Sequence, residues 1–190
     1  TQLLDDSFYK DRTLSELLNK PAYMVMKDSG GNMWLSVEND VYRITLRQDG
    51  SIDEIDAVVC DFRPSLGPLT AIREIDNEIW VGYNHHVCAV KKWPGGELFL
   101  AEVSSSLIFE KGCFISVFFE KENEVWIGTD RGLFRYNKNN HSLRQYTHDP
   151  DEPESLSQGT VTDLAETYDK ELLVATLKGL NFYNSTTVHF

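Results

Sequence analysis

The short stretch Val125-Trp126-Ile127-Gly128 decides the fold, because versions of it recur along the whole chain. Related stretches begin at Met33, Ile79 and Leu172. We call the large residue at the second position of each copy the anchor. The anchors are Trp34, Trp80, Trp126 and Leu173, and successive anchors lie 46, 46 and 47 residues apart. A fixed period of this length indicates an array of similar structural units.

Each copy lies in the same sequence of short strand-like runs. Before each anchor comes a polar turn, and before that turn comes an apolar run, at 23–26, 69–75, 114–119 and 161–164. A second polar turn and another strand follow it, as in Thr129-Asp130-Arg131-Gly132 leading to residues 133–136. Weaker fourth strands are expected at 52–59, 98–103 and 143–147. Four short antiparallel strands per repeat are typical of a β-propeller blade.

The sequence therefore predicts an all-β protein of four propeller blades, the last one incomplete. We expect the end of a preceding blade or a linking segment at 1–22, and blades at 23–68, 69–113, 114–160 and 161–190. Blades bury their faces against one another, so we expect the anchor tryptophans between blades. Gly82 and Gly128 would let a neighbouring backbone approach closely. A closed ring, an open arc, a dimer, and an N-terminal strand completing the last blade all remain open.

Composition restricts the partners. The 190 residues carry 18 Lys and Arg against 30 Asp and Glu, a formal net charge of −12. Nucleic acid and anionic membrane surfaces would be repelled by such a surface, so neither is expected as a partner. No run approaches the ~20 apolar residues of a membrane span. Cys60, Cys88 and Cys113 form no C-x-x-C pair, and we read them as buried small hydrophobes, with one disulfide left open.

Residues 122–137, ENEVWIGTDRGLFRYN, resemble the two-component regulator propeller repeat. The linking segment 146–157, with its prolines and its Ser155-Leu156-Ser157 element, is similar as well. The resemblance is strong over 114–184 and weaker over 23–103, where Ser36 replaces the glycine and Tyr83 the threonine.

The resemblance implies an extracytoplasmic, periplasmic sensor fragment of a hybrid two-component histidine kinase whose parent lies in the inner membrane. It implies an oligosaccharide-type ligand, and the remaining blades and kinase of a parent chain as partners. A homodimer is also considered. No cofactor is expected.

Propeller ligands usually bind at one rim, and loops on a rigid scaffold commonly carry recognition residues. We expect that rim to be formed by the turns after the anchor strands and by the links to the next innermost strands. Tyr83 would offer a ring face to a sugar, and Asn, His and Arg would offer hydrogen bonds. The candidate rim residues are Glu38, Arg63, Tyr83, Asn84, His85, His86, Asp130, Arg131 and Lys178. For each residue singly, an ordinary solvated turn is the competing interpretation.

Metal and enzyme chemistry are weakly signalled. Adjacent His85 and His86 on a strand would point to opposite faces, so they make a poor chelating pair. The acidic run 149–154 lacks the glycine and spacing of a calcium loop. The chain has no Gly-x-Ser-x-Gly, no His-Glu-x-x-His and no kinase core. The first hypothesis is a non-catalytic sensor, and the alternatives are a protein-interaction scaffold or a propeller glycan hydrolase or lyase.

Overall fold

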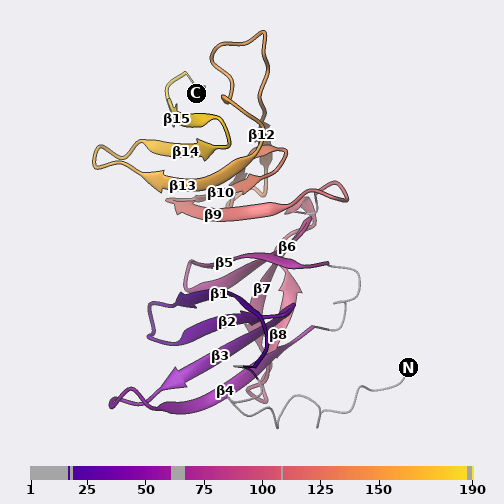
Figure 1. The fold of residues 1–190 in the computed structure, drawn as a ribbon, viewed down its shortest axis with the longest axis vertical. Coiled ribbons are helices and arrows are strands. Elements are labelled where there is room, and N and C mark those ends of the chain that lie inside the picture. Colours follow the sequence, from indigo (N-terminus) through magenta and orange to yellow (C-terminus); the bar gives the residue numbers. More distant parts are fainter. Residues whose placement is uncertain (1–16, 18, 61–66, 108, 188–189) are drawn as a thin grey trace.

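The protein is a β-propeller arc of four blades in the computed structural model (Figure 1). The structure describes residues 17, 19–60, 67–107, 109–187 and 190. The described chain contains β-strands and one short 3-10 helix, η1 (Ser105–Leu107).

In blade 1 the strands are β1 (Ala22–Lys27), β2 (Met33–Val37), β3 (Asp40–Leu46) and β4 (Ile52–Val59). In blade 2 they are β5 (Leu69–Ile75), β6 (Glu78–Tyr83), β7 (His86–Lys92) and β8 (Leu98–Glu102). In blade 3 they are β9 (Ile115–Lys121), β10 (Glu124–Thr129), β11 (Gly132–Asn137) and β12 (Leu143–Tyr146). In blade 4 they are β13 (Val161–Glu166), β14 (Leu172–Thr176) and β15 (Gly179–Tyr183).

Tight turns give each blade its antiparallel order. Within each blade, successive strands pair antiparallel in chain order. Asp76 and Asn77 connect β5 to β6 and both have positive φ, 49° and 62°. Two such residues form a type I′ hairpin turn, whose twist matches that of the flanking strands. Glu122 and Lys170 adopt positive φ in the corresponding turns of blades 3 and 4.

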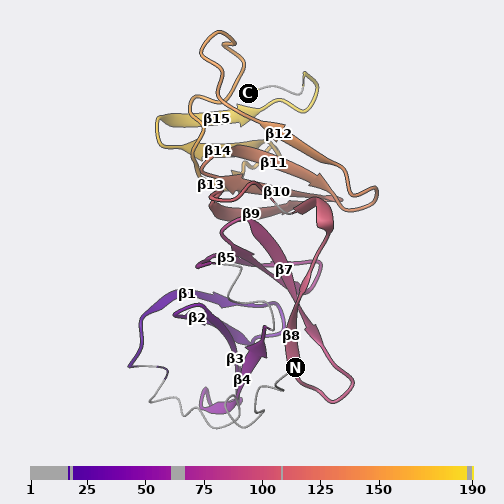
Figure 2. The same cartoon turned by 90° about the vertical axis from the view of Figure 1, so that its right-hand side faces the viewer.

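The innermost strands of successive blades lie side by side. β5 contacts β9, β9 contacts β13, and β1 contacts β5 (Figures 1 and 2). This neighbourhood makes the four blades an arc around one central surface. We call the face of a blade that points to the next blade along the chain its following face, and the opposite one its preceding face.

Blades 1 and 2 are also joined at their outer edges, which the sequence did not predict. The outer strands β4 and β8 pair parallel, through Val58 with Leu98 and Val59 with Phe99. The eight strands of the two blades therefore form one sheet, in the order β1-β2-β3-β4-β8-β7-β6-β5. Blades 1 to 3 each contain the four antiparallel strands expected from the repeat, and blade 4 contains three among the described residues.

The anchor tryptophans fill the interfaces between blades, as predicted. Trp34 belongs to the apolar cluster between blades 1 and 2, Trp80 to that between blades 2 and 3, and Trp126 to that between blades 3 and 4. Gly82 and Gly128, each two residues after an anchor tryptophan, leave room for the neighbouring blade. A Cβ on Gly82 would lie 3.0 Å from Ile115 of blade 3, and one on Gly128 would lie 2.7 Å from Val161 of blade 4.

The three cysteines are buried free thiols. Cys60 and Cys88 lie in the cluster between blades 1 and 2, and Cys113 in that between blades 2 and 3. Burial raises the pKa of the Cys88 thiol to about 12. A thiol in this environment behaves as a small apolar side chain, which agrees with the packing interpretation of the sequence.

The two ends of the arc differ. Leu17 packs against Val37 and Tyr42 on the preceding face of blade 1. Blade 4 has three strands within the described residues, and the proposed closing strand from residues 1–16 lies outside them. Over the part of the chain that is described, no helix is long and apolar enough to cross a membrane.

Candidate functional site

The turn after each anchor strand is held at the same end of its blade by one repeated hydrogen bond. In every blade a turn N–H donates to the carbonyl just before the innermost strand, over 3.0 to 3.2 Å. The pairs are Glu38 with Pro21, Asn84 with Pro68, Asp130 with Phe114, and Leu177 with Thr160. These four turns therefore occupy equivalent positions on one rim of the arc.

The turn of blade 2 is tied directly to the link that leads into blade 3. We call residues 83–86 the second-blade turn. The carbonyl of Asn84 accepts from the Ile115 N–H at 3.0 Å, and the carbonyl of His85 accepts from the Phe109 N–H at 2.8 Å. A ligand that touches this turn would thus lie beside the segment that positions the innermost strand of blade 3.

The same link reaches the turn of blade 3. The Phe114 N–H donates to Asp130 Oδ1 at 2.8 Å, and Arg131 forms an ion pair with Glu110 at 2.7 Å. Asn84 and His85 are thereby connected to Asp130 and Arg131 through residues 109–115. Four of the residues proposed from the sequence thus lie around one link.

The second-blade turn contains three buried polar atoms for which the described residues provide no hydrogen-bond partner. They are Asn84 Oδ1, His85 Nδ1 and His86 Nδ1. The two imidazole rings lie 4.3 Å apart between centroids, so adjacent histidines here do not diverge as they would on a regular strand. His86 Nδ1 lies 3.9 Å from Glu102 Oε1, too far for a hydrogen bond. An unsatisfied buried polar group costs about 1–3 kcal/mol, so a group that bonded to these atoms would remove part of that cost.

The two histidines do not meet the requirements of a metal site. Among the described residues, no group of three or more His, Cys, Asp or Glu side chains could hold an ion. An amide and two imidazoles at the second-blade turn can form directional hydrogen bonds.

Burial, together with the neighbouring His86 and Lys111, lowers the pKa of His85 below its usual 6.5. The ring is thus neutral in the folded protein at pH values where the unfolded chain already binds a proton. We expect the free energy of unfolding to decrease as pH falls below about 6.5, because the unfolded state gains protons first. Above this pH His85 makes no pH-dependent contribution.

The variant His85→Gln should reduce that decrease, as measured by urea unfolding at a series of pH values between about 7 and 5. Identical pH dependences for the wild type and the variant would contradict the assignment to His85.

Other predicted rim residues are placed differently. Tyr83 is 1% exposed, and its hydroxyl donates to the Asn39 carbonyl at 3.1 Å. The expectation that its ring would meet a sugar is wrong, because the ring is part of the core between blades 1 and 2. Glu38 forms an ion pair with Lys20 at 2.8 Å, at the turn of blade 1. Lys178 is exposed at the turn of blade 4, and Arg63 lies outside the described residues.

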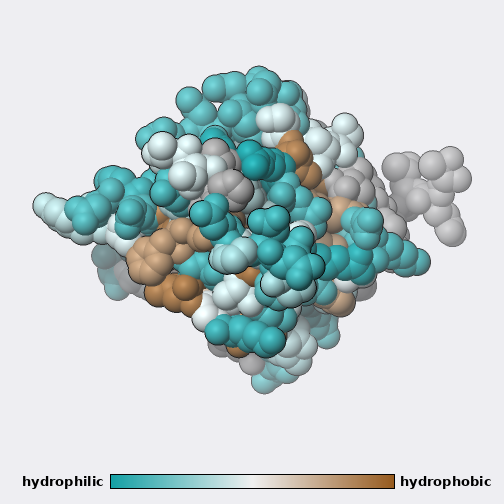
Figure 3. Space-filling model, turned by 90° about the horizontal axis from the view of Figure 1, so that it is seen from above, coloured by the Kyte–Doolittle hydropathy of each residue, from teal (hydrophilic) through white to brown (hydrophobic). Residues whose placement is uncertain are grey.

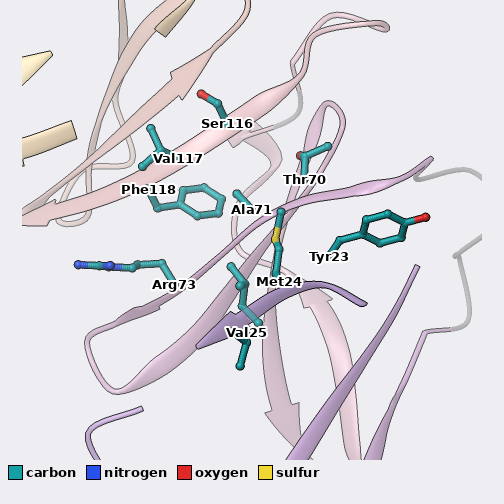
Figure 4. Close-up of a pocket in the computed structure, with 10 residues that line it drawn as sticks. Tyr23, Met24, Val25, Thr70, Ala71, Arg73, Ser116, Val117 and Phe118 are labelled. Carbon is teal, nitrogen blue, oxygen red and sulfur yellow. The ribbon is translucent and has the colours of Figure 1, made fainter. Parts of the chain in front are cut away.

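A groove on the central surface was missed by the sequence analysis. It has a volume of about 340 Å³ and is formed by the innermost strands β1, β5 and β9 (Figure 4). Hydroxyl groups come from Tyr23, Thr70 and Ser116, and Arg73 adds a guanidinium. Apolar side chains, including Val25 and Phe118, complete the lining. No carboxylate is among the described residues that line it, so it offers recognition groups rather than a pair of catalytic acids.

The groove hydroxyls occupy one repeated position. In each innermost strand the pairing register shifts once, between Ala22 and Met24, Leu69 and Ala71, Ile115 and Val117, and Val161 and Asp163. The residues at these bulges all carry hydroxyl groups and are Tyr23, Thr70, Ser116 and Thr162. A bulge re-aims a side chain relative to the regular strand. The repeat therefore places one hydroxyl at the bulge of each innermost strand, and those of Thr70, Ser116 and Thr162 donate to backbone carbonyls of the adjoining strands.

Comparison with protein-family models and with curated proteins found no match for this chain. Solved structures are similar. The extracellular domain of BT4673 from B. thetaiotaomicron, described as a hybrid two-component system, superimposes with a TM-score of 0.68 at 17% identity, over 90% of this chain. The corresponding domain of BT3049 from the same organism gives a TM-score of 0.51 at 22% identity, over 67% of this chain. These likenesses agree with the propeller architecture.

This chain spans 22% of the BT4673 chain and 19% of the BT3049 chain. An enzyme shares the architecture too. Virginiamycin B lyase from Staphylococcus aureus has a TM-score of 0.56 at 15% identity, over 87% of this chain and 53% of that one. The fold alone therefore does not separate sensing from catalysis.

Proposed function

We propose that this chain is a non-catalytic sensor segment of a hybrid two-component receptor. It would work in the periplasm and bind an oligosaccharide-type ligand at the rim that carries the second-blade turn. Two similar solved structures are extracellular domains of hybrid two-component systems, which supports the sensor class. The observation that carries the ligand site is the cluster of three buried polar atoms on Asn84, His85 and His86 for which the described residues provide no partner.

The chemistry of this cluster suits hydroxyl groups. The lowered pKa favours the neutral form of the His85 ring, in which one ring nitrogen accepts and the other donates. The amide of Asn84 also presents both kinds of group. A sugar hydroxyl donates and accepts as well, so it can match whichever group faces it. Bonding would remove the cost of leaving these atoms unsatisfied.

Arg131 can join the site at small cost. Its partner Glu110 has an 86% exposed side chain, and the Arg131 side chain is 43% exposed. Exposed ion pairs of this kind contribute about 0–1 kcal/mol, so a ligand can displace Glu110 easily. The guanidinium would then supply directional donors beside the second-blade turn.

The position of the turn suggests how binding would be relayed. Backbone bonds from Asn84 and His85 hold residues 109 and 115, which lead into blade 3. A ligand that bonds both sides of this link would favour one arrangement of blades 2 and 3 over others. Such differential binding is what a sensor requires, and the kinase chemistry would reside elsewhere in the parent protein.

Thermal unfolding against a panel of plant, host and microbial oligosaccharides tests this function. A ligand at about 100 times its dissociation constant should add about 2.7 kcal/mol to the unfolding free energy. The double variant His85→Gln/His86→Gln should lose this stabilisation. Asn139→Ala, in the turn between β11 and β12 at the other end of blade 3, should retain it.

Three outcomes would count against the proposal. No stabilisation by any oligosaccharide would contradict ligand sensing by this chain. Equal stabilisation of the wild type and the histidine variant would place the ligand elsewhere. Turnover of the stabilising glycan would favour the hydrolase or lyase alternative.

A further inference from the structure

One aromatic ring is exposed on the rim that carries the second-blade turn. It belongs to Phe114, which lies in the link between blades 2 and 3 and is 45% exposed. The residues at the same place before the other innermost strands are Pro21, Pro68 and Thr160, so only blade 3 has a ring of this kind here. Single exposed aromatic rings are common on protein surfaces, so the surroundings of Phe114 decide what it can bind.

The exposure of Phe114 does not come from an end of the arc. Exposed apolar side chains are also found on blade 4, among them Leu180 and Phe182. Figure 3 looks onto that end of the molecule and shows hydrophobic atoms bordered by hydrophilic ones. Phe114 lies inside the arc instead, because blades 2 and 4 flank the blade that it leads into. Its ring is therefore exposed on the rim and not on a face that another blade would cover.

The backbone that carries the ring is fixed on both sides. The Phe114 N–H donates to Asp130 Oδ1 at 2.8 Å, and the Phe114 carbonyl accepts from the Asp130 N–H at 3.0 Å. The N–H of the next residue, Ile115, donates to the Asn84 carbonyl at 3.0 Å. Phe114 is thus held between the turn of blade 2 and the turn of blade 3. A ring on a fixed backbone loses little further freedom when a ligand covers it, which favours binding.

Hydrogen-bonding groups lie on both sides of Phe114. On the side of blade 2 are the three buried polar atoms of the second-blade turn, for which the described residues provide no partner. On the side of blade 3 is the Arg131 guanidinium. A Cβ built on Gly112 would lie 3.5 Å from Arg131 Nη2, so this group lies against the link two residues before Phe114. An apolar ring is therefore flanked by polar groups that can accept and donate.

We propose that a sugar ring of the ligand lies on the ring of Phe114. This inference rests on the proposed function and narrows its ligand to one with a pyranose ring that exposes an apolar C–H face. Such a ring presents C–H groups on its face and hydroxyl groups around its edge. The aromatic face is apolar and carries negative charge density, so it attracts the C–H groups. The second-blade turn and Arg131 are placed to bond the hydroxyl groups. Phe114 thus takes the role that the sequence suggested for Tyr83, whose ring is buried.

Isothermal titration calorimetry with each oligosaccharide of the plant, host and microbial panel tests the role of Phe114. Phe114→Leu keeps an apolar side chain but removes the flat ring, and should weaken binding of the tightest oligosaccharide by about tenfold. Phe114→Tyr keeps the ring and should bind within about threefold of the wild type. Phe114 forms its hydrogen bonds through the backbone, so both variants should keep the wild-type melting temperature without sugar.

A matched control comes from Tyr168, which is 99% exposed in the turn between β13 and β14, at the opposite rim. Tyr168→Ser removes an exposed aromatic ring and should bind like the wild type. Suppose that Phe114→Leu keeps wild-type affinity for an oligosaccharide that His85→Gln/His86→Gln no longer binds. That result would overturn this inference and leave the proposed function standing, as would equal losses for Phe114→Leu and Phe114→Tyr. A wild type that binds no oligosaccharide would overturn both.

Discussion

Replacing Trp126 by alanine is expected to lower the free energy of unfolding by about 3–5 kcal/mol. The side chain is 1% exposed and lies between blades 3 and 4. Its ring contacts Tyr146 at 5.8 Å and Tyr183 at 4.7 Å between centroids, and the Arg135 guanidinium lies 5.5 Å above it. Its Nε1 has no hydrogen-bond partner in the described structure, so the cost comes from lost packing and from the lost cation–π contact with Arg135.

The effect should be specific to the interface position. Trp93 is 36% exposed and stacks on Phe99 at 4.2 Å, away from the anchor column. Trp93→Ala should therefore cost about 1 kcal/mol, close to the value for a surface aromatic pair. Urea unfolding followed by circular dichroism gives both values. Equal losses for the two variants would show that Trp126 does not hold the blades together.

Replacing Gly132 by alanine is expected to cost about 2–5 kcal/mol. Gly132 begins β11 with φ 121°, a conformation that residues with a side chain rarely adopt. An added Cβ would lie 2.3 Å from the Tyr146 carbonyl oxygen. Because that atom is backbone of the neighbouring strand β12, the clash can be relieved only by moving the strand.

A variant at Gly50 serves as a control that separates the cost of the clash from the cost of the backbone conformation. Gly50 also has a positive φ, 82°, but an added Cβ there meets nothing within 4 Å. Gly50→Ala should cost only the strain of the conformation, about 1 kcal/mol. Thermal unfolding of the two variants measures the difference. If Gly132→Ala were no more destabilising than Gly50→Ala, the close approach of β12 to this glycine would be contradicted.

Much of the architecture follows from the repeat because packing between blades imposes it. Blades pack face to face, so the anchor residue (Trp34, Trp80, Trp126 or Leu173) is apolar in every unit. A fixed period in the sequence exposes such positions directly. The pairing of β4 with β8 could not be found in this way, since Val58 and Leu98 belong to weak outer strands that carry no repeated motif.

The site was predictable in part. The departure of the second-blade turn from the repeat pointed to Asn84, His85 and His86, each of which has a buried polar atom without a partner among the described residues. The same departure pointed to Tyr83, which is buried because its ring fills the core between blades 1 and 2. Sequence gives a position along the strand but not the face on which the side chain lies when the strand is buried on both sides. The groove around Arg73 was missed for a related reason, because a bulge breaks the period-two alternation.

The most direct test of the ligand site is a titration followed through the histidine rings. Protein with labelled histidine would be titrated with the oligosaccharide that stabilises it most, and the ring resonances recorded by NMR. We predict saturable changes at His85 and His86, with His141 and His148, which hydrogen-bond to Tyr136 and the Leu156 carbonyl, unaffected. Unchanged resonances at His85 and His86, in the presence of a bound oligosaccharide, would contradict the account.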